Sequence, residues 1–314
     1  MLPFFITIDT EGDGLWDNPK EIKTENSLFI PRFQALCEKY GFIPIWLTDY
    51  EMAMDDRYVA FIREKVQKGL CEVGLHVHAL NNPPIYPLEG EKTRRNPYLI
   101  EYPEDVMREK IKTLIDLIEN RMGIKAISHR AGRWTINQAY IDVLIDMGIK
   151  YDCTVTPSVD WTSNRGVTAG SKGSNYSSYK NGKSTLRGSQ PGKGLIEYPV
   201  SIVKCEKIII PNIFTVKSFG RSIKAFIKKR PLWLRPNGNN LSEMKYVLKR
   251  IKATDVGFAE FMIHSSELMP AGSPTFKDEK AIDKFYDDCD KLFAYAKKLG
   301  FCGATFDQLE KESN

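Results

Sequence analysis

The histidines of this chain are few, and all of them lie in short motifs whose residue types suit a metal site. Each one stands at or beside the end of a short apolar run: His76, His78, His129 and His264. An acidic trio follows the first apolar run: Asp9, Glu11 and Asp13. Because a globular protein ordinarily scatters histidines over its surface, this concentration predicts one metal-dependent site built from several strand ends.

The spacing of His76 and His78 suits shared coordination of one ion. Side chains alternate along a strand, so positions two apart point to the same face. Two imidazoles placed in this way can bind Zn²⁺ or a similar ion at about 2.0–2.1 Å. The alternative is a half-buried pair of histidines that hydrogen bonds satisfy. For His129 the favoured interpretation is a buried, hydrogen-bonded ring without a catalytic role.

Asp9 and Glu11 also share a face if the first strand continues through them, and Gly12 then lets the backbone turn. Beside a metal ion, one carboxylate can act as a ligand while the other accepts a proton from water. A solvated acidic turn explains Asp13 but not Asp9, which ends an apolar strand. The residues therefore predict divided roles for Asp9 and Glu11 without deciding which of them is the ligand.

Strands and helices alternate along most of the sequence. Apolar runs bounded by turn residues predict strands at 3–9, 43–47, 71–76, 125–128, 151–155, 196–203, 208–210, 257–263 and 303–305. Helical periodicity with capping residues predicts helices near 27–40, between 55 and 69, and at 104–122, 136–147, 218–230, 241–253 and 278–299. Long loops near 79–103 and 162–194 interrupt the pattern. We expect one α/β domain over 1–314 with a parallel sheet.

The residues with candidate chemistry fall at or just beyond the C-terminal ends of predicted strands: Asp9, His76, His129, Asp160 and His264. Active sites of (β/α) barrels lie at that end of the strands, and doubly wound sheets bind ligands there too. A site that draws on the first strand and nearly the last favours a closed or nearly closed barrel.

Positive charge is concentrated in one stretch of the chain. Residues 204–252 contain 13 Lys and Arg against two acids, Glu206 and Glu243, which gives +11 where the whole chain carries +5. Such asymmetry indicates an anionic partner or, as the favoured alternative, a solvated basic face. The stretch includes an amphipathic helix at 217–230, with the apolar residues Phe219, Ile223, Phe226 and Ile227 and the basic residues Lys217, Arg221, Lys224 and Lys228.

This helix has two interpretations. A basic amphipathic helix can lie on an anionic membrane, whereas core packing with a solvated charged face is the favoured alternative. No apolar run approaches the roughly 18 residues that a spanning helix needs, and neither a secretory signal pattern nor a Cys-x-x-Cys pair occurs. We therefore expect a cytoplasmic protein with reduced thiols and no nucleic-acid partner, and peripheral contact with the inner face of the membrane through 217–230 is a further option.

Five motifs together resemble those of the polysaccharide deacetylases, the NodB-homology family also called carbohydrate esterase family 4. They occur in that family's order between residues 6 and 264: Asp9-Thr10-Glu11-Gly12, Gly74-Leu75-His76-Val77-His78, Arg130-Ala131-Gly132-Arg133-Trp134, Asp160-Trp161 and Met262-Ile263-His264. The following Asn81-Asn82-Pro83-Pro84 is similar to a subgroup associated with O-antigen and capsule gene clusters. The resemblance implies a distorted (β/α)₇ barrel, which agrees with the alternation of strands and helices.

The resemblance also implies catalytic roles. Asp9 resembles the catalytic base and Arg130 the arginine that orients and charges it. His264 resembles the general acid, and Asp160 the acid that supports it. Glu267, three residues after His264, either orients that histidine or faces solvent.

For the metal and the substrate, the resemblance implies two further groups. One divalent ion, expected to be Zn²⁺, would be held by Glu11, His76 and His78. The substrate pocket would be lined by Arg133, Trp134 and Trp161.

The chain departs from the family pattern at three places. Asp9-Thr10-Glu11 stands where the family has adjacent aspartates, so the acidic ligand is either Glu11 or Asp9. His76-x-His78 replaces His-x-x-x-His, and Leu80 stands where the second histidine would be. Arg130-Ala131-Gly132-Arg133 replaces Arg-x-Pro-Tyr, which reshapes the acyl pocket.

The implied function is that of a metal-dependent hydrolase which removes an N-acyl group, expected to be acetyl, from an amino sugar in cell-surface polysaccharide synthesis. A nucleotide-linked or lipid-linked sugar fits a cytoplasmic enzyme. The alternatives are a deformylase on the same scaffold, a catalytically silent carbohydrate-binding protein, and a TIM-type amidohydrolase. A silent binder needs neither base nor acid. The amidohydrolase needs a further ligand late in the chain, where the sequence offers mainly His264.

Overall fold

The computed structural model describes residues 2–15, 19, 21–88, 96–211 and 216–313, except for the side chains at 216–218 and 312–313. Its centre is a curled sheet with the strand order β10-β1-β2-β3-β4-β5-β7-β6, and β11 pairs with the beginning of β1. The pair β6 and β7 is antiparallel and the other pairs of this sheet are parallel. The strands are β1 Leu2–Thr10, β2 Pro44–Thr48, β3 Glu72–Val77, β4 Ser128–Ala131, β5 Tyr151–Asp152, β6 Ser184–Arg187, β7 Gly194–Glu197, β10 Ala259–His264 and β11 Phe301–Gly303.

A small second sheet continues the curl beyond β10. It pairs β8 (Ile202–Lys204) with β9 (Pro231–Trp233) in antiparallel fashion. Backbone hydrogen bonds join it to β10: Ser201 N donates to Glu260 O, and Met262 N donates to Leu234 O. The expected α/β class with a mostly parallel, curled sheet is therefore confirmed.

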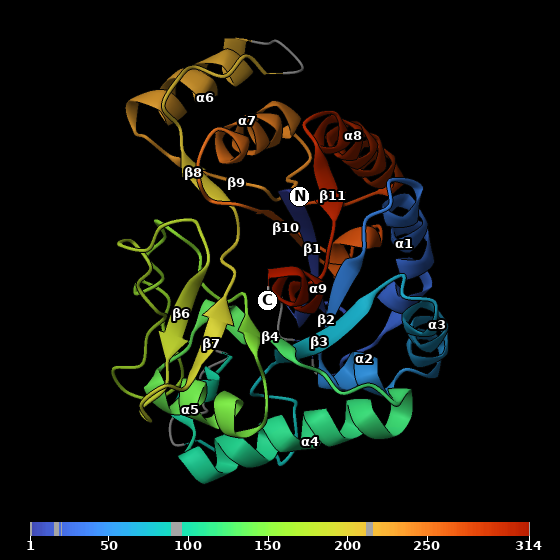
Figure 1. Ribbon diagram of the computed structural model, residues 1–314, viewed down its shortest axis with the longest axis vertical. Helices are drawn as coiled ribbons and strands as arrows, with labels where there is room; N and C mark the ends of the chain where they lie inside the picture. The colour runs from blue at the N-terminus through green and yellow to red at the C-terminus, as the bar shows by residue number, and fades with distance from the viewer. Residues whose placement is uncertain (1, 16–18, 20, 89–95, 212–215, 314) are drawn as a thin grey trace.

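Helices surround the sheet. Figure 1 shows α1, α3, α4 and α8 around the outside of the curl, α9 within it, and α6 at one end of the molecule beyond α7. The helices are α1 Ile30–Lys39, α2 Tyr50–Met54, α3 Asp56–Gln67, α4 Glu104–Met122, α5 Gln138–Asp146, α6 Val216–Ile227, α7 Leu241–Lys252, α8 Glu279–Lys298 and α9 Phe306–Ser313. Within the described part of the chain, no helix combines the length and hydropathy needed to cross a bilayer.

The alternation of β1 explains why the site lies at one end of the sheet. Its outer row packs against the helices and consists of Phe4, Ile6 and Ile8. Its inner row begins with Phe5, whose ring centroid lies 4.7 Å from that of Phe306 on α9. Asp9 ends the same inner row. The apolar beginning of the row packs with α9 at one end of the curl, and the polar end of the row lies at the candidate site.

Several predicted elements agree with the structure because their signals are local. The helix predicted at 104–122 is α4, which ends at Gly123 in the left-handed conformation (φ 70°). Asp55 caps α3 by accepting a hydrogen bond of 2.8 Å from Tyr58 N. Residues 89–95 of the loop predicted at 79–103 lie outside the described residues.

Other predicted elements were wrong. The strand expected at 196–203 is divided between β7 and β8, because Pro199 has no N–H to donate to a ladder. No strand forms at 208–210, and the strand expected at 125–128 lies at Ser128–Ala131. The loop expected at 162–194 contains β6. The short elements α2, α9 and β9 were not predicted.

Candidate metal and catalytic centre

The candidate site lies at the ends of four of the five consecutive strands from β10 to β4. The register pairs Asp9 of β1 with His264 of β10, and His76 of β3 with Arg130 of β4. Because these strands are parallel, their C-terminal ends meet at one edge of the sheet. All four side chains are buried. The sheet thus brings together residues that lie far apart in the sequence.

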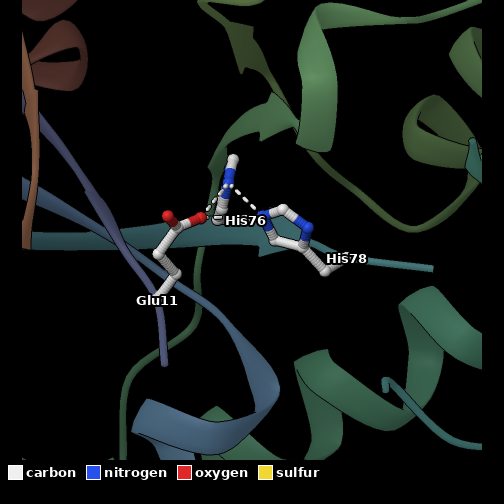
Figure 2. A group of neighbouring side chains, drawn as sticks. All are labelled: Glu11, His76 and His78. Atoms are coloured by element: carbon white, nitrogen blue, oxygen red, sulfur yellow. Dashed lines mark hydrogen bonds and ion pairs between the residues drawn. The ribbon is translucent and has the colours of Figure 1, made fainter. Parts of the chain in front are cut away.

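Glu11, His76 and His78 form a compact group whose candidate ligand atoms all lie within 4.8 Å of one another. His78 Nε2 lies 2.8 Å from Glu11 Oε2 and 3.0 Å from His76 Nε2. His76 Nε2 lies 3.5 Å from the same carboxylate oxygen. Figure 2 shows the carboxylate and the two rings directed toward one another. Among the residues that the structure describes, no second group of His, Cys, Asp and Glu converges in this way.

The hydrogen bonding of His76 makes this group suited to a cation. Its Nδ1 lies 3.0 Å from the carbonyl oxygen of Arg130, which can only accept, so Nδ1 carries the proton. In the neutral ring, Nε2 is then an acceptor that faces the Glu11 carboxylate. Two acceptors in contact need a proton or a metal ion between them. Two imidazoles and a carboxylate, one ring oriented by a backbone carbonyl, are a donor set that zinc sites use.

The pKa values of these groups show the same need for positive charge. Burial alone would raise the pKa of Glu11, but the neighbouring His264, His76 and His78 lower it well below its usual range. Burial alone would lower the pKa of His76, but the carboxylates of Asp9 and Glu11 raise it. The neighbouring histidines therefore favour the ionised carboxylate of Glu11, as a bound cation would.

Asp9 is held by a buried arginine rather than by the histidine pair. Arg130 Nη1 donates to Asp9 Oδ1 at 2.6 Å. The other guanidinium nitrogens donate to Thr7 Oγ1, to the Cys153 carbonyl and to Glu260. Burial alone would raise the pKa of Asp9, but Arg130 and the neighbouring histidines lower it. The geometry thus keeps a buried carboxylate ionised.

His264 lies beside Asp9 and has two further polar neighbours. His264 Nε2 lies 3.6 Å from Asp9 Oδ2. Its Nδ1 lies 3.2 Å from Glu267 Oε2 and 3.0 Å from Arg235 Nη2. Arg235 also donates to both oxygens of Glu267 at 3.2 Å. Of the two options for Glu267, the structure selects contact with His264, and its side chain is buried.

The predicted contact between Asp160 and His264 was wrong. Asp160 is exposed, and its Oδ1 accepts a hydrogen bond of 2.9 Å from Thr162 N. Its backbone forms an isolated β-bridge with Asn175 in the long loop. Glu267 occupies the position beside the His264 ring that Asp160 was expected to fill.

Arg133 has a different place from the one expected. Its φ is 57°, its guanidinium lies 3.9 Å from the centre of the Tyr98 ring, and it donates to the carbonyls of Asn96 and Arg165. These contacts join the two long loops. They assign Arg133 to loop packing, and none of them directs it to a substrate.

The expected pocket tryptophans form a cluster with a third tryptophan. The Trp233 ring lies 6.1 Å from that of Trp134 and 6.3 Å from that of Trp161, both edge to face. The Arg130 guanidinium lies 5.1 Å from the Trp134 ring. The cluster therefore borders the candidate site at Arg130. Trp161 Nε1 donates to Thr156 Oγ1, which fixes its ring.

His129 is a buried structural residue, as predicted. Its Nδ1 lies 2.6 Å from Asp152 Oδ2, and its Nε2 lies 2.8 Å from the Tyr140 hydroxyl. Burial lowers its pKa, which Asp152 opposes only in part. Both ring nitrogens are engaged within the fold.

The sequence interpretation missed three residues of this centre: Trp233, Arg235 and Glu260. Glu260 carried a usable signal, since it is the one charged residue in the apolar run 258–263. Trp233 and Arg235 had no such signal in the sequence, because their contacts depend on where the small sheet meets β10.

Comparison with other proteins shows the fold. No protein-family model matches the sequence, and no curated protein matches it. A Mycobacterium smegmatis structure assigned to the polysaccharide deacetylases superposes with a TM-score of 0.51 at 13% identity, over 98% of this chain and 89% of that one. A 4-alpha-glucanotransferase from Thermococcus litoralis gives 0.57 at 12% identity, over 99% of this chain and 40% of that one. A family 4 carbohydrate esterase from Streptomyces lividans gives 0.45 at 9% identity, over 96% and 92%. At these identities the first two comparisons establish a shared fold and nothing more.

Proposed function

We propose that this protein is a metal-dependent hydrolase that removes an N-acyl group, with acetyl the expected one, from an amino sugar. One observation carries the proposal: the Glu11, His76 and His78 group lies beside an ionised carboxylate, Asp9, that is itself in contact with His264. The motif resemblance to polysaccharide deacetylases, and the fold shared with a structure assigned to them, support the same reaction class. The same resemblance supports a single catalytic domain of the (β/α)₇ type.

Glu11 rather than Asp9 is the candidate for the acidic ligand. Glu11 Oε2 contacts both histidines, whereas Asp9 Oδ1 accepts from Arg130. Asp9 is therefore the group available to take a proton from the attacking water. A divalent ion held by Glu11, His76 and His78, with Zn²⁺ expected, would supply a Lewis acid for the acyl carbonyl and make water more acidic.

His264 is the candidate for the general acid. An amine is a poor leaving group unless it gains a proton, and the protonated imidazole can give it one. In this protonated form Nδ1–H donates to Glu267, which Arg235 in turn holds through both carboxylate oxygens, and Nε2 is left directed at Asp9 and the reacting atoms. The base and the acid then act from adjacent strands, β1 and β10.

The substrate and its setting rest on the motif resemblance. We place the reaction in the synthesis of a cell-surface polysaccharide, on a nucleotide-linked or lipid-linked amino sugar at the cytoplasmic face of the membrane. The rings of Trp134, Trp161 and Trp233 offer rigid apolar faces beside the catalytic residues for the sugar ring.

The metal site is tested first. Purified protein should bind about one divalent ion per chain, measured by elemental analysis after dialysis. His76→Ala/His78→Ala should abolish this binding, since loss of an outer partner alone costs about 10–100-fold in affinity. Full metal content in the double variant would refute the site.

The reaction is tested by release of acetate or formate from N-acetyl and N-formyl amino sugars that are free, nucleotide-linked or lipid-linked. Preference for the formyl series would assign the deformylase alternative. Asp9→Asn keeps the shape of the side chain but removes the proton acceptor, so turnover should fall by about 10²–10⁴-fold while the metal stays bound. Loss of the metal in Asp9→Asn would instead make Asp9 the ligand and Glu11 the candidate base.

The matched control is Asp160→Asn, the same chemical change at an exposed aspartate outside the centre. We expect turnover within about twofold of the wild type. A loss as large as that of Asp9→Asn would restore the role that the motif resemblance implied for Asp160.

A further inference from the structure

Helix α6 packs on the protein through small side chains and leaves two apolar side chains near its end exposed, whereas Phe219 and Ile223 are partly buried. Its buried residues are Ser222 and Ala225. Phe226 is 39% exposed and Ile227 is 72% exposed. The favoured interpretation of this helix from sequence, core packing of its apolar stripe, was therefore wrong for these two residues. Lys217, one of the basic residues predicted on this helix, has a side chain outside the described part of the structure.

A second pair of exposed apolar side chains lies close to this helix. Ile208 is 42% exposed and Ile210 is 71% exposed. Their neighbours Ile209 and Pro211 line the same cavity, of about 710 Å³, as α6 residues do. Figure 1 places α6 at one end of the molecule, outside α7. Four apolar side chains are thus presented to solvent at the same end of the protein.

The basic residues around these apolar side chains form no ion pair within the described part of the chain, although Arg221 is close enough to Glu243 to oppose the rise in pKa that burial causes in that carboxyl. They are Lys207, Arg221, Lys224, Lys228 and Lys229. None of them forms an ion pair with a residue that the structure describes, whereas the two nearby acids are engaged, Glu206 by Arg250 and Glu243 by Arg230. We call these five residues, together with Ile208, Ile210, Phe226 and Ile227, the α6 surface.

We propose that the α6 surface docks on an anionic lipid bilayer. The exposed apolar side chains would enter the boundary between headgroups and acyl chains, and the basic side chains would meet lipid phosphates. Arg221, Lys224 and Lys228 line the cavity beside α6, which gives a headgroup phosphate a recess at the same surface. Charge complementarity selects an anionic partner, and the aliphatic side chains select a lipid interface over a nucleic acid.

This proposal does not depend on the proposed reaction. The α6 surface shares no residue with the Glu11, His76 and His78 group. Hydrolysis of a soluble amino sugar and attachment to vesicles can therefore succeed or fail separately, and both are measured on every variant.

The first experiment is cosedimentation of the full chain with phosphatidylcholine vesicles that contain or lack phosphatidylglycerol. We expect binding to the anionic vesicles alone, weakened by added salt. Ile210→Ser/Ile227→Ser should lower the affinity about tenfold or more. The matched control is Leu28→Ser/Ile85→Ser, two side chains that are 60% and 70% exposed elsewhere, and it should bind like the wild type.

The second experiment reverses charge. Lys224→Glu/Lys228→Glu should lower the affinity for anionic vesicles by at least about 25-fold, since each basic residue contributes about fivefold. Lys180→Glu/Lys193→Glu makes the same change at two exposed lysines elsewhere and is the control.

Three results would overturn the proposal. The first is no binding, or equal binding to neutral and anionic vesicles. The second is a control pair that loses as much affinity as its test pair. The third is a double-stranded oligonucleotide that displaces the vesicles while the isoleucine changes have no effect, which would assign the basic side chains to nucleic acid.

Discussion

Replacement of Arg130 by Met removes the one cation that the structure places between two buried carboxylates. Arg130 is completely buried and bonds to both Asp9 and Glu260. Removing one partner of a buried ion pair typically costs about 3–5 kcal/mol, because the remaining charge is left without a partner. Two such carboxylates would suggest about twice that cost.

The structure indicates the cost of one unpaired carboxylate rather than two. Burial raises the pKa of Glu260 to about 8, even against the effect of Arg130. At neutral pH this carboxyl gains a proton readily, so the loss of Arg130 leaves mainly Asp9 as an uncompensated charge. We therefore expect Arg130→Met to lower the free energy of unfolding by about 3–5 kcal/mol. Glu260→Gln, which mimics the protonated acid, should cost about 1 kcal/mol or less.

The pH dependence has a definite sign. Despite burial, Arg130 and the nearby histidines lower the pKa of Asp9 below its value in the unfolded chain. Such a group stabilises the fold above the unfolded pKa, and that contribution is lost as the pH falls through the folded value. The difference between wild type and Arg130→Met should therefore shrink as the pH falls below about 4, the unfolded value, and through the lower folded value.

The assay is urea unfolding followed by circular dichroism, with a chelator present so that metal binding does not contribute. Arg57→Met is the control, since Arg57 pairs with Asp55 at 3.0 Å but is half exposed. A surface pair contributes about 0–1 kcal/mol. The reasoning fails if Arg130→Met costs no more than Arg57→Met, or if its cost grows as the pH falls.

Two further predictions concern buried charges. Arg235 and His264 lower the pKa of Glu267 to about 2 against the effect of burial. Glu267→Gln should therefore lower the free energy of unfolding by about 3 kcal/mol at neutral pH. This cost, measured by urea unfolding, should decline as the pH falls from about 4.5 towards 2. Lys110 of α4 donates to the carbonyls of Ala79, Asn82 and Pro84, so Lys110→Met should destabilise the protein by about 2–5 kcal/mol. Because burial lowers the pKa of Lys110 to about 8, the wild type gains stability as the pH rises from 8 to 10.5, and the cost of Lys110→Met should grow by about 3 kcal/mol over that range. A cost that falls instead would contradict the assignment.

The part of the site that could be predicted from sequence is the part with a short-range signal. His76 and His78 share a face because strand side chains alternate, and the structure directs both at Glu11. Asp9 ends an apolar strand, and the structure buries it at the end of the inner row. The helix at 104–122 had a periodic apolar stripe. In each case neighbouring residues determine the outcome.

The part that could not be predicted depends on register between distant strands. Arg235 reaches His264 because Leu234 pairs with Ser201 and Met262 through the backbone, which sets β9 beside β10. No local pattern in the sequence encodes that alignment. Glu260 and Arg130 likewise meet across the inside of the curl, and nothing in their local sequences indicates that these two distant residues pair.

The acid beside His264 differs from the one that the motif resemblance implied. A carboxylate can orient an imidazole through Nδ1 whether it comes from a distant loop or from the same turn. Glu267 follows His264 by three residues, and its Oε2 also accepts the His264 backbone N–H at 2.9 Å, so the turn Ser265–Leu268 brings it to the ring by itself. Asp160 depends on the conformation of a long loop, which here bridges to Asn175 and leaves the acid exposed. The locally encoded acid, Glu267, is therefore the one in contact with the histidine. Only the three-dimensional structure distinguishes it from Asp160, the acid that the motif suggested.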